Sequence, residues 1–209
     1  MAIGNLNSDV VLLKYMKLTP LIQKAINYAA KLHAGQVRKA SIELPYISHP
    51  YSVAWIVADY CQDEEVIAAA LLHDVIEDVA GYSLAALELD FGPRVASLVQ
   101  SVSEVDKSVG MSQLPWRERK DAYLANLKTN EEGALYITAA DKIHNLQSLI
   151  EAYLDRGEQI WSDFHSPADS KLWFYHEVLL ILEKRLASPI VAELAKVYEQ
   201  AVTVMNIKV

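Results

Sequence analysis

The side chains best suited to chemistry lie in residues 71–78, LLHDVIED, at the end of the apolar run VIAAALL. Burying an unpaired charge there costs several kcal/mol, roughly, unless the charge is paired or bound to a metal ion. On one helix His73 would share a face with Glu77, and Asp74 with Asp78, because residues four apart are neighbours. A histidine nitrogen beside carboxylate oxygens suits Mn²⁺, Fe²⁺ or Zn²⁺, and the remaining carboxylates could orient or deprotonate a metal-bound water. Taken alone, the pattern is also typical of a solvated helix end.

Two other segments carry residues of the same kinds. His49 lies in PYISHP, and Asp141 lies in the apolar segment YITAADKIHNLQSL. An isolated histidine such as His49 is more often a capping or packing residue than a ligand. Asp141 could equally form an ion pair with Lys142 or Arg119. Residue types alone therefore leave both interpretations open at each position.

Helices are the elements that must position these residues. Apolar residues make up 52% of the 209 residues, there are only 7 Gly and 7 Pro, and Ala, Leu, Ile, Lys and Glu recur at helical spacing. The pattern predicts an all-α protein with a single domain over residues 1–209 and about nine helices, with Thr19 and Ser83 as N-caps. The expected helices cover about 19–33, 50–60, 64–77, 83–90, 93–105, 116–128, 131–153, 168–186 and 189–205. Loops are expected at 34–50, 106–115 and 154–167.

The composition also limits the function classes. A net charge of −8 argues against binding polymeric DNA or RNA, which needs a basic face. An acidic protein can still bind a small anion where local cations or a metal ion reverse the field. Cys61 is the only cysteine, so no intrachain disulfide forms. No apolar stretch reaches the ~18 residues of a membrane span, and a cytoplasmic protein is expected.

The order His, His-Asp, Asp resembles that of the HD-domain metal-dependent phosphohydrolases. Four segments resemble, in order, the hydrolase domain of the RelA/SpoT family and the small alarmone hydrolases: HAGQVRKASIELPYISHPYSVAWIV, AAALLHDVIED, FGPRVASLVQSVSE and ITAADKIHNLQSL. The similarity covers about residues 20–185. It implies an HD-domain helical bundle that hydrolyses the 3′-pyrophosphate of guanosine 3′,5′-bispyrophosphate, (p)ppGpp, to GDP or GTP and pyrophosphate.

The resemblance also implies roles for individual residues. The metal ligands would be His49, His73, Asp74 and Asp141, and Mn²⁺ is the usual metal of the family. The pair that activates the attacking water would be Glu77 and Asp78. The substrate contacts would be Arg38 and Lys39 after the GQ turn, with Asn145 and Ser148 near the ribose and the guanine. His33 is expected to be structural, and His144 to hold a ligand carboxylate.

Three departures from the family pattern bear on the substrate. The 40–44 loop is longer than usual, Gln147 replaces a common Arg, and residues 104–115 read EVDKSVGMSQLP. None of them is an implied metal ligand, so they leave the choice between guanine and adenine open. The cations of the WRERK segment, Arg117, Arg119 and Lys120, are weaker candidates for phosphate contacts.

Alternative functions remain at this stage. The chain could hydrolyse another nucleotide, such as an adenine alarmone or a nucleoside monophosphate, or it could bind an alarmone without turnover. The presence of both Glu77 and Asp78 argues against the non-catalytic alternative. The expected partner is a small nucleotide substrate, without membrane or polymeric nucleic acid, and a homo-oligomer stays open.

Overall fold

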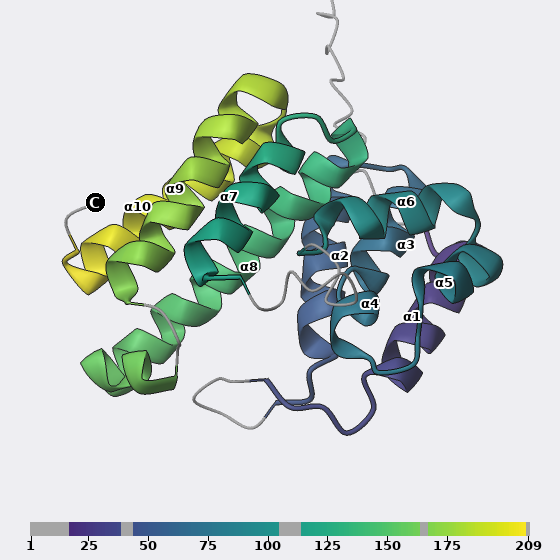
Figure 1. Ribbon diagram of the computed structural model, residues 1–209, viewed down its shortest axis with the longest axis horizontal. Coiled ribbons are helices and arrows are strands. Elements are labelled where there is room, and N and C mark those ends of the chain that lie inside the picture. Colours follow the sequence, from purple (N-terminus) through teal and green to yellow (C-terminus); the bar gives the residue numbers. More distant parts are fainter. Residues whose placement is uncertain (1–16, 39–43, 105–113, 164–166, 208–209) are drawn as a thin grey trace, which may run out of the picture.

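The computed structural model describes residues 17–38, 44–104, 114–163 and 167–207 (Figure 1). These residues form ten α-helices and one 3-10 helix, and their β-structure is limited to one antiparallel bridge between Val37 and Pro45. The helices are α1 (Pro20–Leu32), α2 (Ser48–Tyr60), α3 (Glu64–Leu72), α4 (Val75–Asp78), α5 (Leu84–Phe91), α6 (Pro93–Val102), α7 (Trp116–Leu127), α8 (Glu132–Arg156), the 3-10 helix η3 (Gly157–Asp163), α9 (Ala168–Arg185) and α10 (Pro189–Met205). The all-α prediction is confirmed. None of these helices combines the length and the apolar character that crossing a membrane requires.

The long helix α8 is the centre of the fold. It packs against α2, α3 and α6 and also against α9, α10 and η3. In Figure 1, α7, α9 and α10 lie on one side of α8, and α1 to α6 lie on the other. One cluster of buried apolar side chains includes residues from all of the α-helices. A side chain in the middle of α8 can therefore face residues from both groups of helices.

Several helices begin where the sequence predicts. The Thr19 side chain accepts a hydrogen bond from the Ile22 amide at 3.2 Å, and Pro20 occupies the first turn of α1. Ser83 caps α5 in the same way through the Ala86 amide. These local signals act within one turn of the chain, which is why they can be read from sequence.

The predicted helix over 64–77 is wrong in one important respect. Helix α3 ends at Leu72, His73 and Asp74 form a turn, and α4 starts at Val75. The Asp74 carbonyl accepts the amides of Glu77 and Asp78, so the chain starts a new helical turn there. Tertiary contacts of His73 and Asp74 override the helical periodicity, and the four polar side chains do not lie on one continuous helix.

The expected loop at 154–167 is also corrected. Helix α8 continues to Arg156, and the chain leaves the helix at Gly157, whose positive φ of 58° is one that glycine adopts readily. Residues 157–163 then form η3, anchored by the fully buried side chain of Ile160. The expected loop at 34–50 ends earlier than predicted, because α2 already begins at Ser48, and its residues 39–43 lie outside the described residues. Most of the expected loop at 106–115 also lies outside them.

Candidate metal centre and cavity

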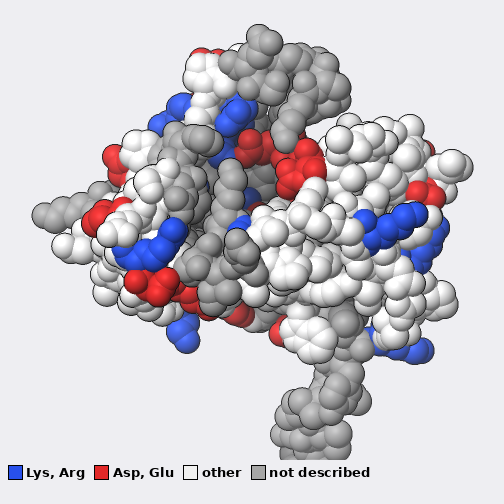
Figure 2. All heavy atoms as spheres, turned by 90° about the horizontal axis from the view of Figure 1, so that it is seen from below, with Lys and Arg blue, Asp and Glu red and all other residues white. Residues whose placement is uncertain are grey.

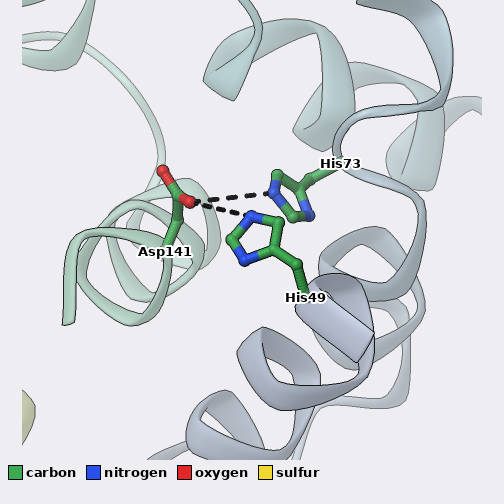
Figure 3. Close-up of side chains that lie close together, drawn as sticks. All are labelled: His49, His73 and Asp141. Atoms are coloured by element: carbon green, nitrogen blue, oxygen red, sulfur yellow. Dashed lines mark ion pairs between the residues drawn. The ribbon is translucent and has the colours of Figure 1, made fainter. Parts of the chain in front are cut away.

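Three separate parts of the chain bring the four predicted metal ligands together. His49 lies in the first turn of α2, His73 and Asp74 form the turn after α3, and Asp141 lies in α8. The Nε2 atom of His49 lies 3.2 Å from Asp141 Oδ1 and 3.6 Å from Asp74 Oδ2. The Nε2 atom of His73 lies 3.9 Å and 3.2 Å from the same two oxygens. Figure 3 shows the two imidazoles and the Asp141 carboxylate pointing toward one another.

This arrangement fits a divalent metal ion. Neighbouring ligand atoms held about 2.1 Å from one ion lie roughly 3.0–3.4 Å apart, which is close to the separations observed. One ligand atom each from His49, His73 and Asp141 lies within 4.8 Å of the others. The Nε2 atom of His73 is buried and has no hydrogen-bond partner among the described residues. A buried nitrogen without a partner is costly unless a ligand such as a metal ion takes its lone pair.

The outer nitrogens of both histidines are already occupied. His73 Nδ1 lies 2.8 Å from the Ala70 carbonyl and donates to it, which leaves the Nε2 lone pair facing the site. His49 Nδ1 lies 2.9 Å from His144 Nδ1. The expectation that His144 holds a ligand carboxylate is therefore corrected. His144 contacts the candidate ligand His49 instead, across the packing between α8 and α2.

The two aspartates stabilise positive charge at this point. Burial alone would raise the pKa of Asp74, but His73 and His49 hold that pKa well below its usual value. Burial likewise opposes ionisation of Asp141, whose pKa Lys142 and His49 hold well below its usual value. Burial would lower the pKa of His73, yet Asp74 and Asp141 raise it to about 9. The site favours a cation, which is the condition that metal binding requires.

Asp141 has two separate sets of contacts. Its Oδ2 atom accepts from Lys142 Nζ at 2.6 Å, so the ion pair considered from the sequence is present. Its Oδ1 atom faces the histidines and accepts from Asn145 Nδ2 at 2.5 Å. The ion pair and a ligand role are therefore compatible, because each uses a different oxygen.

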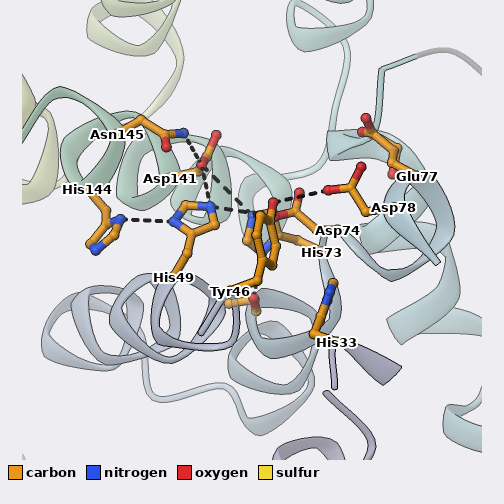
Figure 4. A network of polar contacts seen from close by, with 12 residues as sticks. His33, Tyr46, His49, His73, Asp74, Glu77, Asp78, Asp141, His144 and Asn145 are labelled. Atoms are coloured by element: carbon orange, nitrogen blue, oxygen red, sulfur yellow. Dashed lines mark hydrogen bonds and ion pairs between the residues drawn. The ribbon is translucent and has the colours of Figure 1, made fainter. Parts of the chain in front are cut away.

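Glu77 and Asp78 lie on α4 next to His49, His73, Asp74 and Asp141, the candidate ligands that are here called the metal-ligand cluster (Figure 4). Burial and the nearby Asp74 carboxylate raise the pKa of Glu77 to about 7. Its Oε1 atom accepts from the Glu104 amide at 2.6 Å. The Asp78 Oδ2 atom lies 3.1 Å from the Tyr46 hydroxyl. A carboxylate with a pKa near 7 is suited to exchanging protons at neutral pH.

A cavity of about 690 Å³ joins these groups to a cationic and aromatic wall. Its acidic lining consists of Asp74, Glu77, Asp78, Glu104 and Asp141. Its cationic and aromatic lining consists of Arg38, Lys120, Lys142, Lys171, Trp116, Tyr123, Phe174 and Tyr175. Figure 2 shows Asp and Glu side chains gathered inside a hollow of the molecule, with Lys and Arg side chains close by. Such a cavity can hold an anion that carries an aromatic base.

The predicted substrate residues fall in different places. Arg38 and Asn145 both line the cavity, and Arg38 Nη2 donates to Asn145 Oδ1 at 3.2 Å. Ser148 lies one turn further along α8 and is not among the lining residues, so its role stays a prediction. Lys39 lies outside the described residues. In the WRERK segment Lys120 lines the cavity, whereas Arg117 pairs with Asp121 and stacks on a tryptophan ring.

The sequence reasoning missed several residues of the site. Tyr46 donates to Asp74 Oδ2 at 2.6 Å, and it lies three residues before His49 in the same PYISHP segment. That closeness to a candidate ligand is a usable signal. Glu104 and Lys171 belong to segments that lie far from the other site residues in sequence, and no local pattern distinguishes them.

Comparisons with known proteins agree with this geometry. The model of the HD domain family matches residues 25–165. The chain is 34% identical over 164 residues to the bifunctional (p)ppGpp synthase/hydrolase SpoT of Escherichia coli (strain K12), a match that covers 74% of this chain and 22% of SpoT. It is 37% identical over 131 residues to the guanosine-3′,5′-bis(diphosphate) 3′-pyrophosphohydrolase MESH1 of Xenopus tropicalis, covering 62% of this chain and 69% of MESH1. The chain thus spans about a fifth of SpoT and most of MESH1.

Solved structures show the same likeness. The structure described as "A metazoan ortholog of SpoT hydrolyzes ppGpp and plays a role in starvation responses" matches with a TM-score of 0.73 and 30% identity, over 89% of this chain and 98% of that one. The crystal structure of lmo0812 from Listeria monocytogenes EGD-e matches with a TM-score of 0.65 and 30% identity, over 76% of this chain and 99% of that one. This chain therefore belongs to the HD domain family and, within it, is similar to SpoT and MESH1.

Proposed function

We propose that this protein hydrolyses the 3′-pyrophosphate of (p)ppGpp and releases GDP or GTP and pyrophosphate. The observation that carries the proposal is one cavity in which a His/Asp cluster and Glu77 face a cationic and aromatic wall. The names of SpoT and MESH1, and the ppGpp hydrolysis ascribed to the metazoan SpoT ortholog, support the same substrate. A (p)ppGpp molecule combines a purine with two chains of phosphates, which matches both parts of the wall.

The metal ion in this proposal is Mn²⁺, the usual metal of the family that the sequence resembles. His49, His73, Asp74 and Asp141 would hold it, since imidazole and carboxylate ligands together suit such an ion. When bound, a divalent ion supplies Lewis-acid chemistry: it polarises a phosphoryl oxygen and lowers the pKa of water.

The chain's own residues complete the reaction. Glu77, with its pKa near 7, accepts the proton of the attacking water, and Asp78 orients that water. The water oxygen forms a bond to the phosphorus attached to the ribose 3′ oxygen, and the bond between that phosphorus and the 3′ oxygen breaks. The 3′ oxygen gains a proton, and pyrophosphate leaves. Arg38 neutralises phosphate charge, assisted by Lys120 and Lys142, which line the cavity while paired with Glu104 and Asp141.

Three finer assignments belong to the same proposal. Guanine is the expected base, held near Asn145 and Ser148. Residues 1–209 are proposed to form one hydrolase domain, which the single apolar core supports. A cytoplasmic location follows from the substrate, because a highly charged nucleotide does not cross a membrane and must be hydrolysed where it is made.

The test is a substrate panel. The purified protein with Mn²⁺ is incubated separately with ppGpp, ppApp and a deoxynucleoside monophosphate, and products are separated by anion-exchange chromatography. We expect GDP and pyrophosphate from ppGpp, with the highest kcat/KM of the three. A tenfold preference for ppApp, about 1.4 kcal/mol in transition-state binding, would overturn the guanine assignment. Turnover of the monophosphate alone would overturn the proposed function.

A further inference from the structure

Helix α4 is too short to fix Asp78 by itself. It has four residues, of which Val75 alone is buried, and Asp78 is the last of them and exposed. A single helical turn is unstable in water without contacts from elsewhere. The carbonyl of Asp78 is also one of those that a helix end leaves without an intrahelical partner. Other parts of the chain must therefore hold this end of α4.

One contact holds the main chain of Asp78. His33 is buried, and its Nδ1 atom lies 2.7 Å from Gln36 Oε1. Since Gln36 Oε1 can only accept, His33 donates from Nδ1, and this orients the Gln36 amide. Gln36 Nε2 then donates to the Asp78 carbonyl at 2.9 Å. The Gln36 side-chain amide is therefore held by two hydrogen bonds, one from His33 after α1 and one to the carbonyl of Asp78 at the end of α4.

A second contact holds the side chain of Asp78. The Tyr46 hydroxyl donates to Asp74 Oδ2 at 2.6 Å and lies 3.1 Å from Asp78 Oδ2 (Figure 4). The Asp74 oxygen is the one that faces both histidine Nε2 atoms. One hydroxyl thus sets the separation between a proposed metal ligand and a carboxylate proposed to orient the water.

These two contacts belong to one unit. The Tyr46 amide donates to the Gln36 carbonyl at 2.8 Å, beside the antiparallel bridge between Val37 and Pro45. The rings of His33 and Tyr46 also pack together, with centroids 5.0 Å apart. Main-chain and ring contacts therefore keep Gln36 and Tyr46 at a fixed distance from each other.

We propose that His33, Gln36 and Tyr46, here called the brace, are positioning residues that hold the Asp78 carboxylate at its distance from the metal-ligand cluster. The proposal rests on the proposed function, because it assigns the brace an effect on the reaction through Asp78. It also gives a defined role to His33, which belongs to no ligand set, because His33 orients the Gln36 amide.

The brace is also close in sequence to a residue assigned to nucleotide binding. Arg38 follows Gln36 by two residues, and its amide donates to the Leu44 carbonyl on the opposite side of the bridge. The Arg38 side chain reaches Asn145 on α8. Residues 36–38 thus position two groups: Gln36 contacts Asp78, and Arg38 is the cation assigned to the nucleotide.

The decisive experiment is a double-mutant cycle with Gln36→Glu and Asp78→Asn. Glu has the shape of Gln but cannot donate to the Asp78 carbonyl. We expect Gln36→Glu alone to lower kcat for ppGpp about 10–100-fold, the range typical of groups that orient a ligand, with KM changed less than about threefold. In the Asp78→Asn background the same change should have no further effect. An equal loss in both backgrounds would overturn the proposal.

Tyr46→Phe distinguishes the two contacts of the brace. This variant should lower kcat and also weaken Mn²⁺ binding measured by calorimetry, because Tyr46 contacts Asp74 directly. Gln36→Glu should leave Mn²⁺ binding unchanged. The matched controls are Tyr82→Phe, which loses a 2.9 Å bond to Asp90, and Gln62→Glu, which loses a 2.6 Å bond to the Ala58 carbonyl. Both controls should keep the kcat of the parent protein, and weaker Mn²⁺ binding in Gln36→Glu would contradict the assignment.

A readout without substrate or metal separates this proposal from the proposed function. In chelator-treated protein, amide hydrogen exchange of the peptide that contains residues 75–79 should be faster in Gln36→Glu than in Gln62→Glu. Unchanged exchange would overturn the brace. If the parent protein failed to hydrolyse ppGpp, the proposed function would fall, and the exchange result would still decide whether the brace holds α4.

Discussion

At the scale of single residues, the carboxylates of the cavity differ because their neighbours differ. Asp74 and Asp141 face imidazoles or Lys142, and these contacts keep their pKa values low in spite of burial. Glu77 is buried near Asp74, and burial together with the Asp74 carboxylate raises its pKa to about 7. Different surroundings thus assign some carboxylates to cation binding and another to proton transfer.

Glu77→Gln tests whether Glu77 transfers a proton and takes no part in cation binding. Gln keeps the shape of the side chain but cannot accept a proton, so Mn²⁺ content should stay at the parent level while kcat falls about 10²–10⁴-fold. Elemental analysis and steady-state kinetics on the same sample provide the two measurements. A loss smaller than tenfold with full metal content would argue against a proton-transfer role.

The raised pKa of Glu77 has a consequence for stability in metal-free protein. Burial raises this pKa from 4.5 to about 7, so the folded state binds the proton more tightly than the unfolded state. The resulting stabilisation is fully present below pH 4.5 and is lost as the pH rises through 7. Relative to Glu77→Gln, the chelated parent protein should lose up to about 3 kcal/mol of unfolding free energy between pH 4.5 and 8, since one pKa unit corresponds to about 1.4 kcal/mol. Urea titrations at both pH values measure this, and a difference that does not change with pH would contradict it.

The limits of sequence reasoning at this scale are visible in two residues. The family resemblance implies that His49 is a metal ligand, whereas its own segment does not, and the structure places its Nε2 atom 3.2 Å from an Asp141 oxygen. Tyr46 lies three residues before His49 and is still not predicted as a site residue, because closeness in sequence does not say what its hydroxyl contacts. Its contacts with Asp74 and Asp78 depend on how residues 36–38 and 44–46 lie against α4, and no residue pattern encodes that tertiary placement.

At the scale of elements, helix boundaries set by local signals can be predicted from the sequence, whereas those set by tertiary contacts cannot. The starts of α1 and α5 are predictable because Thr19 and Ser83 act on amides three residues away. The break between α3 and α4 is not, because the apolar and polar periodicity continues through it. The turn at His73 and Asp74 is stabilised by groups on α2 and α8, which a local pattern cannot reveal.

The close approach of α8 to α3 and α6 provides a test at the element scale. A Cβ atom at Gly133 would lie 2.8 Å from Val66 Cγ2 and 3.0 Å from Leu98 Cδ2. Both neighbours are buried, so Gly133→Ala should lower the unfolding free energy by about 1–3 kcal/mol through overpacking. Urea denaturation measures the change. An increase in stability, as expected from helix propensity alone, would show that α8 has room to shift at this point.

At the scale of the whole molecule, the metal-ligand cluster joins distant parts of the chain. Its ligands come from α2, the turn after α3, and α8, so an ion bound there connects segments that lie far apart in the sequence. The net charge of −8 is compatible with an anionic substrate because Arg38, Lys120, Lys142 and Lys171 gather in one cavity. Global charge therefore argues against a polymer ligand, whereas the four cations that line the cavity can contact the phosphates of a small nucleotide.

Metal binding should consequently raise the melting temperature. An ion present at 100 times its Kd and bound only to the folded state stabilises by about 2.7 kcal/mol. For a chain of this size that corresponds to a rise of about 5–10 °C in Tm. The rise should be absent in His73→Ala and present in His176→Ala, whose ring stacks on Tyr198 instead of lining the cavity. An equal Tm response in both variants would contradict the ligand assignment.

The central claim is that water attacks the phosphorus of the 3′-pyrophosphate. The most direct measurement is hydrolysis of ppGpp by the Mn²⁺-loaded protein in water enriched in ¹⁸O, with mass spectrometry of both products. The mechanism predicts one ¹⁸O atom in pyrophosphate and none in GDP. Water adds its oxygen to the phosphorus, and the ribose keeps its own 3′ oxygen when the bond between them breaks. Label in GDP, or release of orthophosphate in place of pyrophosphate, would contradict it.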